Sequence, residues 1–264
     1  MQTALTIAGS DSSGGAGIQA DLKTFAAHAV FGTSAITAIT AQNTNGVSVM
    51  LALPPDLVVA QIDAVASDFE IASTKIGMLA NASIIHAVAD AIERHKLQRI
   101  VVDPVMVASR GGVLLDTEGV EALRDRLLRG ALVVTPNTTE ARVLTGLTID
   151  TVADMRQAAE QLVSMGAQNA IVTGGHIDGP PIDVLYDGHQ FLELSADRVD
   201  TKHTHGTGCT LASAISARLA LGDSVADALR AAKAYVTLAL QQAPGLGRGH
   251  GPLQHFPQLP AWMK

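Results

Sequence analysis

The chain has little of several features that would mark a protein class. It contains one cysteine among 264 residues, which excludes an intramolecular disulfide and is typical of a reducing compartment. Its 18 lysines and arginines are outnumbered by 25 acidic residues, so the formal net charge is −7, and the basic residues form no cluster. This charge balance argues against nucleic acid and anionic membranes as partners.

Long apolar runs and a targeting segment are also missing. No stretch of about 18 apolar residues lacks charge or frequent glycine, so we expect no membrane-spanning helix. Residues 1–5 carry no basic side chain and Asp11 follows soon after, so we expect no signal peptide and a cytoplasmic location. Aromatic residues make up only 3% of the chain and hydrophobic residues 47%, which predicts an aliphatic core of the kind found in layered α/β folds.

What the chain does have is a regular alternation of β-rich and alanine-rich helical segments. We expect strands at 5–8, 33–41, 74–76, 100–103, 132–135 and 170–173, and a hairpin at 183–186 and 190–194. We expect helices at 16–29, 56–69, 83–95, 117–128, 152–165, 210–221 and 224–241. The alternation predicts an α/β fold, with a mostly parallel central sheet flanked by helices on both faces. No linker is evident, so residues 1–264 are expected to form a single domain that ends in an irregular segment at 244–264.

A glycine-rich loop that turns into a helix is the most informative stretch. Residues 204–209 have the sequence Thr-His-Gly-Thr-Gly-Cys, followed by small residues. Backbone N–H groups at such a helix start bind anions, so we predict that Gly206, Thr207 and Gly208 form an anion hole. Cys209 at the same helix start is expected to have a lowered pKa and to serve as the base in phosphoryl transfer. The alternative is a glycine-rich turn with a buried, inert cysteine.

Polar residues directly follow the expected strands. They are Gly9-Ser10-Asp11, Gln42-Asn43, Gly77-Met78, Asp103, Asn137 and Thr173-Gly174. Ligand sites in open α/β sheets lie at the carboxyl ends of the strands. Any one of these residues can simply mark a strand end, but six in succession predict a shared crevice.

The first loop, residues 9–17, resembles two nucleotide-binding motifs and matches neither. A Walker P-loop needs a lysine followed by serine or threonine after its second glycine, and this loop has none. The spacing of Gly15 and Gly17 fits a dinucleotide fingerprint, but the next strand ends in Gln42-Asn43 where that fingerprint expects an acid. We expect instead a loop that lets a flat small molecule approach the backbone. A nicotinamide-dependent dehydrogenase is a distant alternative.

Two polar side chains are candidates for recognising a heterocyclic substrate. Asp21, one turn into the first helix, can accept a hydrogen bond from a substrate hydroxyl or amine, or it can be a solvated acid on the helix face. Gln42 offers both a donor and an acceptor, which suits the edge of a ring, or it can cap the end of its strand.

Asp103 and Glu140 are candidates for holding Mg²⁺, partly through water. Asn137 stands three residues before Glu140, a spacing that places both on one face as a helix begins. The alternative for this segment is a helix cap with an acid in the first turn. The nine histidines form no metal-binding set, and we interpret His203 and His205 as structural or loop-orienting residues.

With these residues in place, the chain resembles the hydroxymethylpyrimidine/phosphomethylpyrimidine kinases of thiamine biosynthesis, in the ribokinase-like superfamily. The resemblance covers nearly the whole length and is carried by residues 5–25, 40–44, 75–79, 103–106, 135–141 and 204–210. It implies ATP-dependent phosphorylation of 4-amino-5-hydroxymethyl-2-methylpyrimidine and then of its monophosphate, with ATP and Mg²⁺ as cofactors, in a homodimer. The alternatives are a pyridoxine or pyridoxal kinase of the same family and a pyrimidine-binding relative that has lost catalysis.

The resemblance also implies residue roles. The residues implied for the pyrimidine pocket are Gly9, Asp21, Gln42, Met78 and Val105. Those implied for the nucleotide are Asn137, Thr173 and Gly175, with Asp103 and Glu140 for Mg²⁺ and Gly206, Thr207, Gly208 and Cys209 for the anion hole and base.

Two positions depart from the family pattern. Relatives commonly have lysine where this chain has Thr173, whose hydroxyl can donate a hydrogen bond but carries no charge. Relatives also often have a lysine soon after Asp-Pro-Val-Met, where Arg110 can supply a charge. We expect the loops at 110–113 and 178–181 to act as flaps that exclude water.

Overall fold

The computed structural model describes residues 1–106, 112, 114–175, 177 and 179–257. Arg110, His176 and parts of both expected flaps, 110–113 and 178–181, lie outside the described residues. In the described part of the chain, no helix is both long enough and apolar enough to cross a membrane.

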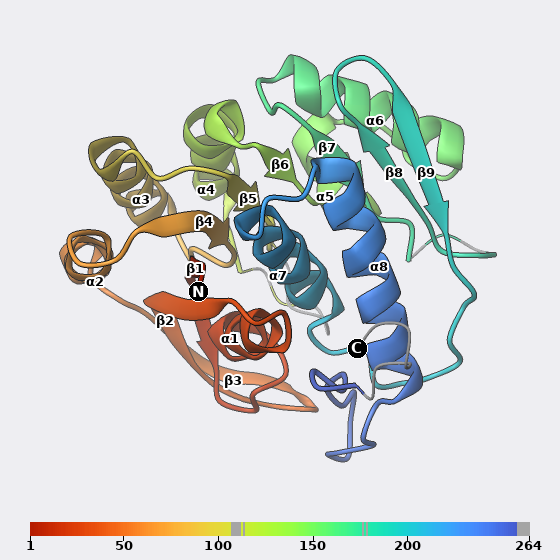
Figure 1. Cartoon of the computed structure of the whole chain (residues 1–264), viewed down its shortest axis with the longest axis horizontal. Coiled ribbons are helices and arrows are strands. Elements are labelled where there is room, and N and C mark those ends of the chain that lie inside the picture. The colour runs from red at the N-terminus through yellow and green to blue at the C-terminus, as the bar shows by residue number, and fades with distance from the viewer. Residues whose placement is uncertain (107–111, 113, 176, 178, 258–264) are drawn as a thin grey trace.

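A nine-stranded sheet runs through the described residues in the order β3-β2-β1-β4-β5-β6-β7-β8-β9 (Figure 1). Its strands are β1 (Thr3–Asp11), β2 (Phe31–Asn43), β3 (Gly46–Ala52), β4 (Ile71–Ile76), β5 (Ile100–Val102), β6 (Val133–Val134), β7 (Ala170–Val172), β8 (Ile182–Tyr186) and β9 (Phe191–Ser195). The strands from β2 to β7 pair in parallel, and antiparallel strands close both edges. The mostly parallel sheet expected from the sequence is therefore confirmed.

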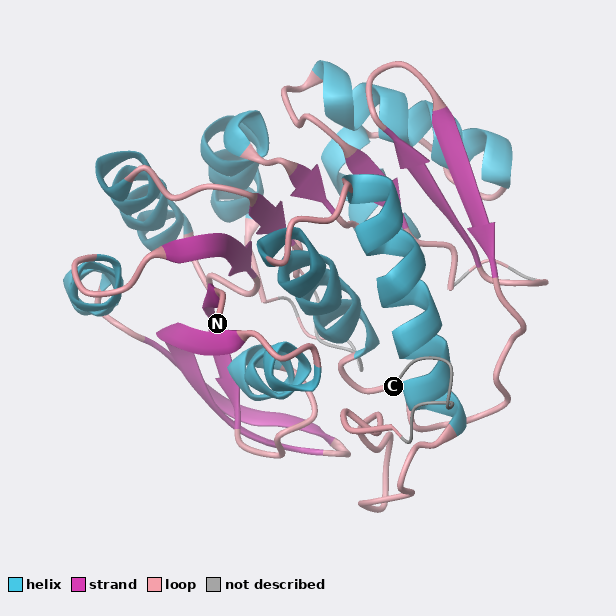
Figure 2. Cartoon of the chain, in the orientation of Figure 1, coloured by secondary structure: helices cyan, strands magenta, loops and turns pink. Residues whose placement is uncertain are grey.

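Helices cover both faces of this sheet (Figure 2). They are α1 (Gly17–Ala27), α2 (Pro55–Ala66), α3 (Ala82–His95), α4 (Thr117–Ala122), α5 (Thr138–Thr145), α6 (Val152–Ser164), α7 (Thr207–Ala220) and α8 (Val225–Gln241). The helices α1, α7 and α8 lie on one face, and α2 to α6 on the other.

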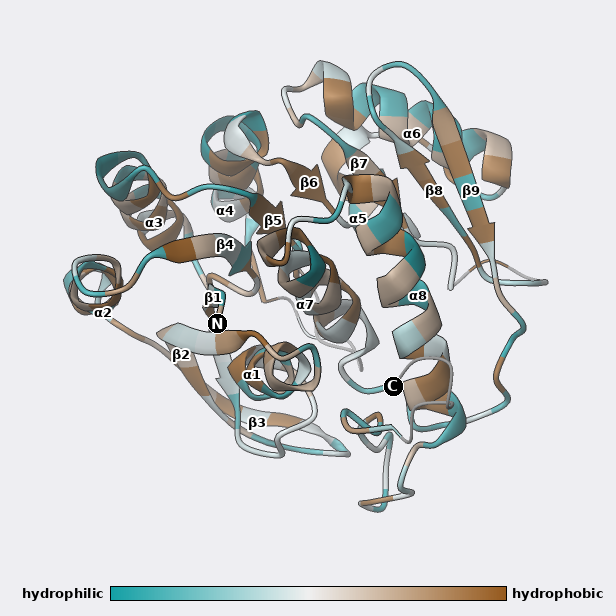
Figure 3. Ribbon diagram, in the orientation of Figure 1, coloured by the Kyte–Doolittle hydropathy of each residue, from teal (hydrophilic) through white to brown (hydrophobic). Residues whose placement is uncertain are grey.

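Side chains that alternate along the central strands fill the core on the two faces. Val101 and Val133 pack toward α7 and α8, whereas Val102 and Val134 pack toward the opposite helices. All four are fully buried, as the period of two along a strand requires. The strands β5, β6 and β7 are accordingly brown, the hydrophobic colour, in Figure 3.

Most expected elements are present with small shifts at their ends, but the helix expected at 117–128 is α-helical only to Ala122 and continues as a π-helix over Leu123–Leu127. Strand β3 was not expected from the sequence. Its side chains are largely exposed, so it lacks the burial that marks the other strands. Helix α5 begins at Asn137, whose side chain accepts hydrogen bonds from the backbone of Thr139 and Glu140. This cap fixes the first turn of α5, and with it the position of Glu140, just after the end of β6.

Candidate functional site

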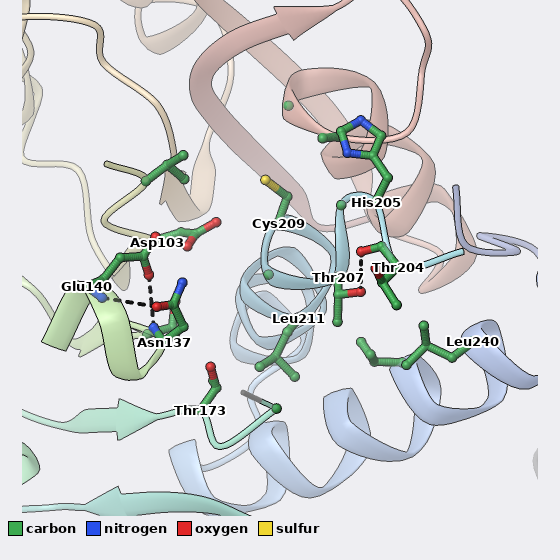
Figure 4. A pocket seen from close by; sticks show the side chains of 18 of the residues that line it. Asp103, Asn137, Glu140, Thr173, Thr204, His205, Thr207, Cys209, Leu211 and Leu240 are labelled. Carbon is green, nitrogen blue, oxygen red and sulfur yellow. Dashed lines mark hydrogen bonds between the residues drawn. The ribbon is translucent and has the colours of Figure 1, made fainter. Parts of the chain in front are cut away.

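A cavity of about 660 Å³ opens at the carboxyl ends of the parallel strands. It is lined by every candidate residue of the sequence analysis except Asp21. Those residues are Gly9, Gln42, Met78, Asp103, Val105, Asn137, Glu140, Thr173, Gly175, Gly206, Thr207, Gly208 and Cys209. The shared crevice expected from the strand-end residues is thus present, and Figure 4 shows how the side chains around the start of α7 face it.

The start of α7 is built as an anion site. Its N-cap is Gly206, with φ of 85° and no capping side chain, and the Thr207 amide donates to the Thr204 carbonyl oxygen at 3.3 Å. Among the described residues, the amides of Gly208 and Cys209 have no acceptor and are left for a ligand. A Cβ at Gly206 would lie 1.8 Å from the carbonyl oxygen of Gly15, so only glycine fits where this loop packs against the first loop. A Cβ at Gly208, by contrast, would point into open space 3.9 Å from Asp103 Oδ1. This space lies between the helix start and the carboxylate.

Cys209 lies at this helix start, but its thiol does not have the lowered pKa that the sequence suggested. Although the residue is partly exposed to the cavity, burial of the thiol and the nearby Asp103 and Asp21 carboxylates raise its pKa to about 12. The ammonium of Lys75 and the Gly17 amide act in the opposite direction and do not compensate. The expectation of a low-pKa thiolate is therefore wrong, because the loss of solvation and the two carboxylates together outweigh Lys75 and the Gly17 amide.

Asp103 and Glu140 form a carboxylate pair on the other side of the cavity. Both are largely buried, and burial is the main reason that the pKa of each is raised, to about 8 for Glu140. The charge of Asp103 contributes to the rise in the pKa of Glu140. Among the described residues, Asp103 Oδ2 makes no hydrogen bond. Glu140 also accepts a hydrogen bond from the Asn137 amide at 2.9 Å, so the capping role considered as an alternative coexists with its place in the cavity.

Asp21 lies beneath the cavity floor, fully buried, and does not line it. It accepts hydrogen bonds from Thr6 Oγ1 and Ser213 Oγ, both at 2.6 Å, and forms an ion pair with Lys75 Nζ at 3.1 Å. Every oxygen of Asp21 is thus engaged by the protein. The expectation of a substrate contact, and the alternative of a solvated acid, are both wrong because α1 packs this face onto α7 and the sheet.

Lys75 is a functional residue that the sequence analysis did not single out. It is fully buried at the cavity wall, where its ammonium is 3.1 Å from Asp21 and 3.8 Å from Asp103 Oδ2. The two carboxylates raise its pKa despite burial. A lysine inside an otherwise buried strand was the available signal, since lysine is rarely buried without a partner.

Asp11, which the sequence analysis named only as a polar residue at a strand end, ties the first loop to the anion loop. It accepts hydrogen bonds from the amides of Ser13, Gly15 and Ala16, and from His205 Nε2 at 2.7 Å. These donors outweigh the effect of burial and lower the pKa of Asp11 to about 2. His205 therefore orients its loop, as expected from the sequence, and also lies against Gln42 in the cavity.

A segment near the end of the chain, residues 249–255, straps two rims of the cavity together. Gly249 N donates to Thr44 Oγ1 at 3.0 Å, and His250 N donates to the Thr44 carbonyl oxygen at 2.9 Å. The His205 amide donates to Gly251 O at 3.1 Å, and Gly251 N donates to His203 Nδ1 at 3.2 Å. The strap thus holds the loop after Gln42 and the loop before α7 in fixed relation, and His203 has the structural role expected for it.

At the opposite end of the cavity, Thr173 and Gly175 lie beside a buried ion pair. Lys233 Nζ is 2.8 Å from Asp183 Oδ2, and Asp183 Oδ1 accepts a hydrogen bond from the Gly174 amide at 3.1 Å. The pair anchors the segment after β7 to α8, whose Val236 and Leu240 add an apolar wall. This end is shaped for a flat, mostly apolar group, while the anion site lies between it and Gln42.

Comparisons with known proteins agree with this geometry. A family model described as phosphomethylpyrimidine kinase matches residues 11–254. The hydroxymethylpyrimidine/phosphomethylpyrimidine kinase of Bacillus subtilis is 50% identical over 255 residues, which span 96% of this chain and 94% of that protein. Among solved structures, an ADP complex of Bacillus subtilis pyridoxal kinase is similar, with a TM-score of 0.90, 40% identity and 97% of each chain covered. A phosphomethylpyrimidine kinase from Clostridium difficile has a TM-score of 0.81 and 41% identity over 90% of this chain and 98% of its own.

Proposed function

The chain belongs to the phosphomethylpyrimidine kinase family, and from this premise we propose that it phosphorylates two acceptors with ATP. The first is the hydroxymethyl group of 4-amino-5-hydroxymethyl-2-methylpyrimidine, and the second is the resulting monophosphate. One observation carries the proposal. An uncapped helix start, a buried carboxylate pair and Gln42 all open onto a single cavity. These are the parts that a phosphoryl transfer needs between a nucleotide and a ring alcohol.

The cavity divides into two binding regions on either side of the start of α7. Asn137, Thr173 and Gly175 lie on the side with the apolar wall of α8, which suits the nucleotide. Gly9, Gln42, Met78 and Val105 line the other side, which suits the pyrimidine. A Cβ at Gly9 would lie 2.3 Å from Met78 Cε, so glycine there lets the methionine reach the wall of the pyrimidine side. The Gly208 and Cys209 amides then face the phosphoryl group as it moves between the two.

The Asp103 and Glu140 carboxylates fit a bound Mg²⁺. Two buried acids with raised pKa values repel each other, and Asp103 Oδ2 has no hydrogen-bond donor among the described residues. A divalent cation bound between the two acids would offset their repulsion and favour their ionised forms, and it would give Asp103 Oδ2 the partner it lacks. When bound, Mg²⁺ supplies charge neutralisation at the nucleotide phosphates. These two residues would hold it, partly through water.

The role of Cys209 follows from its protonation. A thiol with a pKa of about 12 is protonated at neutral pH, and burial is the main cause, with the Asp103 and Asp21 carboxylates adding to it. Cys209 therefore orients the hydroxymethyl group through its sulfur, and as the new O–P bond forms the sulfur takes up the hydroxymethyl proton while the thiol proton passes to the Asp103 carboxylate. A loose transition state needs little help from a base, so the anion hole contributes more than the thiol.

A coupled ADP-release assay tests the proposal. Purified protein with ATP and Mg²⁺ is offered the hydroxymethylpyrimidine, its monophosphate, pyridoxal or no acceptor. We expect release with the two pyrimidines above the rate on pyridoxal. Faster turnover of pyridoxal would favour the second candidate, which the 40% identical pyridoxal kinase structure supports. No release with any acceptor would identify a binding protein that has lost catalysis.

We also propose that the protein is a cytoplasmic homodimer. Large apolar side chains are exposed on the two strands at one edge of the sheet. On β2, Phe31 is 49% and Ile39 50% exposed, and on β3, Val49 is 61% and Leu51 63% exposed. An exposed apolar edge of this kind is typical of an interface between subunits. Sedimentation velocity tests this, because Val49→Lys and Leu51→Lys together should convert a dimer into monomers.

A further inference from the structure

Two cations hold the segment between β7 and β8 at the side of the cavity that suits the nucleotide. The described part of this β7–β8 segment comprises residues 173–175, 177 and 179–181. Its Thr173 and Gly175 line the cavity, and so do the two cations, Arg198 and Lys233. The phosphoryl transfer proposed at the start of α7 uses neither cation.

Arg198 holds the β7–β8 segment from the solvent side with its whole guanidinium group. Nε donates to the carbonyl oxygen of Gly179 at 2.9 Å, Nη1 to that of Gly175 at 3.1 Å and Nη2 to that of Ile177 at 2.6 Å. All three acceptors are neutral, so the guanidinium matches the shape of the chain and neutralises no charge there. Because its donors form a rigid planar fork, three contacts at once fix the course of the backbone around it.

Lys233 holds the same segment from the buried side, partly through Asp183. Lys233 Nζ lies 2.8 Å from Asp183 Oδ2 and donates to the carbonyl oxygen of Pro181 at 3.0 Å. The Gly174 amide donates to Asp183 Oδ1 at 3.1 Å. A Cβ at Gly174 would lie 2.1 Å from the carbonyl oxygen of Ile182, so glycine permits this close approach. Both ends of the segment therefore meet at one buried ion pair.

The ion pair also connects the segment to the helix that forms the facing wall. Val236 and Leu240 follow Lys233 by three and seven residues, so all three lie on one face of α8, and all three line the cavity. On its other side, the segment is attached to the residues before α5, because the Thr173 amide donates to the Pro136 carbonyl oxygen at 3.0 Å. The width of the space between the segment and α8 thus depends on the ion pair.

We propose that Arg198, Asp183 and Lys233 are positioning residues that set the width of the nucleotide side of the cavity. This step rests on the proposed function, which assigns that side to ATP. Losing either attachment lets the turn at Thr173 and Gly175 move relative to α8, so nucleotide affinity falls. The pyrimidine side shares none of these contacts and keeps its affinity.

Isothermal titration calorimetry of the full-length protein with MgADP, and separately with the hydroxymethylpyrimidine, tests the role of Arg198. Arg198 is exposed, so its variants should fold. Arg198→Gln and Arg198→Lys should both raise the Kd for MgADP about tenfold, which equals the loss of one net hydrogen bond, and change the Kd for the pyrimidine less than twofold. The matched control is Arg218→Lys, at an ion pair with Asp223 outside the cavity, which should change neither. Wild-type affinity for MgADP in Arg198→Lys, or equal weakening of both ligands, would overturn the proposal.

The ion pair is tested by removing both of its charges together. Burial raises the pKa of Asp183 and Lys233 counteracts this rise, so removing the lysine alone would leave a buried acid without its cation. Asp183→Asn combined with Lys233→Met keeps the side-chain sizes, and replacing a buried pair by neutral groups often costs little stability. We expect a melting temperature near that of the wild type and a Kd for MgADP about tenfold higher.

Unchanged affinity for MgADP in the folded double variant would overturn the role of the ion pair. If the double variant does not fold, the Arg198 variants decide the proposal. A wild type that binds MgADP but phosphorylates no acceptor would refute the proposed function, and the affinities would still decide the positioning role. A wild type that does not bind MgADP would overturn both.

Discussion

Substituting Gly208 by alanine should make the protein more stable and nearly inactive. Gly208 is in the first turn of α7, faces the cavity and is not among the glycines with positive φ. Alanine can therefore adopt its backbone conformation without strain. The added methyl group would lie 3.9 Å from Asp103 Oδ1 and touch no other heavy atom within 4 Å. It would occupy the space between the helix start and the carboxylate, which the proposed function assigns to the phosphoryl group.

The two effects have different sizes and opposite signs. Replacing a glycine at a compatible position restricts the unfolded chain and stabilises the fold by about 0.4–1 kcal/mol. For a chain of this size, that raises the melting temperature by about 1–4 °C. Blocking one donor of an anion hole typically costs about 10²–10³ in turnover. We therefore expect a variant that melts slightly later than the wild type and turns over at most about 1% as fast.

Thermal melting by circular dichroism and coupled ADP release on the same preparations would measure both effects. Two matched controls separate them. Gly206→Ala should lose both stability and activity, because its Cβ would meet Gly15 O at 1.8 Å. Gly130→Ala meets nothing within 4 Å and should change neither much. Wild-type turnover in Gly208→Ala would refute the assignment of this helix start to the transferred phosphoryl group.

Three further outcomes follow from the buried charges and the thiol. In single-turnover assays, Cys209→Ala should slow phosphorylation of the hydroxymethyl group by up to about 100-fold. It should hardly affect phosphorylation of the monophosphate, because that acceptor oxygen has no proton to transfer. Equal losses on the two acceptors would contradict this. Lys75→Met leaves Asp21 and Asp103 without their cation and should cost about 3–5 kcal/mol in urea unfolding, whereas a cost below about 1 kcal/mol would show that the acids are neutral. The raised pKa of Glu140 means that the folded protein keeps its proton longer than the unfolded chain. Without Mg²⁺, the free energy of unfolding should therefore fall as pH rises from 4.5 to about 8, by up to about 4 kcal/mol. Glu140→Gln or added Mg²⁺ should flatten that slope, and an equally steep slope in Glu140→Gln would assign it to another group.

The sheet and most of the cavity wall could be predicted from sequence because both depend on local patterns. Buried strands such as Ile100–Val102 are short apolar runs, and the polar residue after each one marks the same edge of a parallel sheet. Strand β3 escaped notice because exposed Val49 and Leu51 give it neither alternation nor a buried run. Backbone hydrogen bonds to β2 hold β3 in the sheet, so β3 does not need a face of buried side chains.

The roles of the charged residues could not be predicted in the same way, because they depend on contacts between distant segments. Asp21 is an ordinary helical acid until α1 meets Ser213 on α7, 192 positions away. The pKa of Cys209 follows first from burial and then from three charged neighbours, and no local motif encodes either. The glycine-rich motif identifies the start of α7, but only tertiary packing decides whether the Cys209 thiol at that start is protonated.

The strap at residues 249–255 has a consequence for how the enzyme is made. Thr44 and Gly249 are 205 positions apart, and Asp11 and His205 are 194 apart, so the rims of the cavity close over very long loops. Contacts of such separation form late in folding. A nascent chain leaving the ribosome can complete most of its sheet, yet the cavity cannot bind a ring until residues 204–255 have emerged. Catalysis should consequently appear only after residues 249–255 have been made, and in mild denaturant it should vanish before the sheet opens.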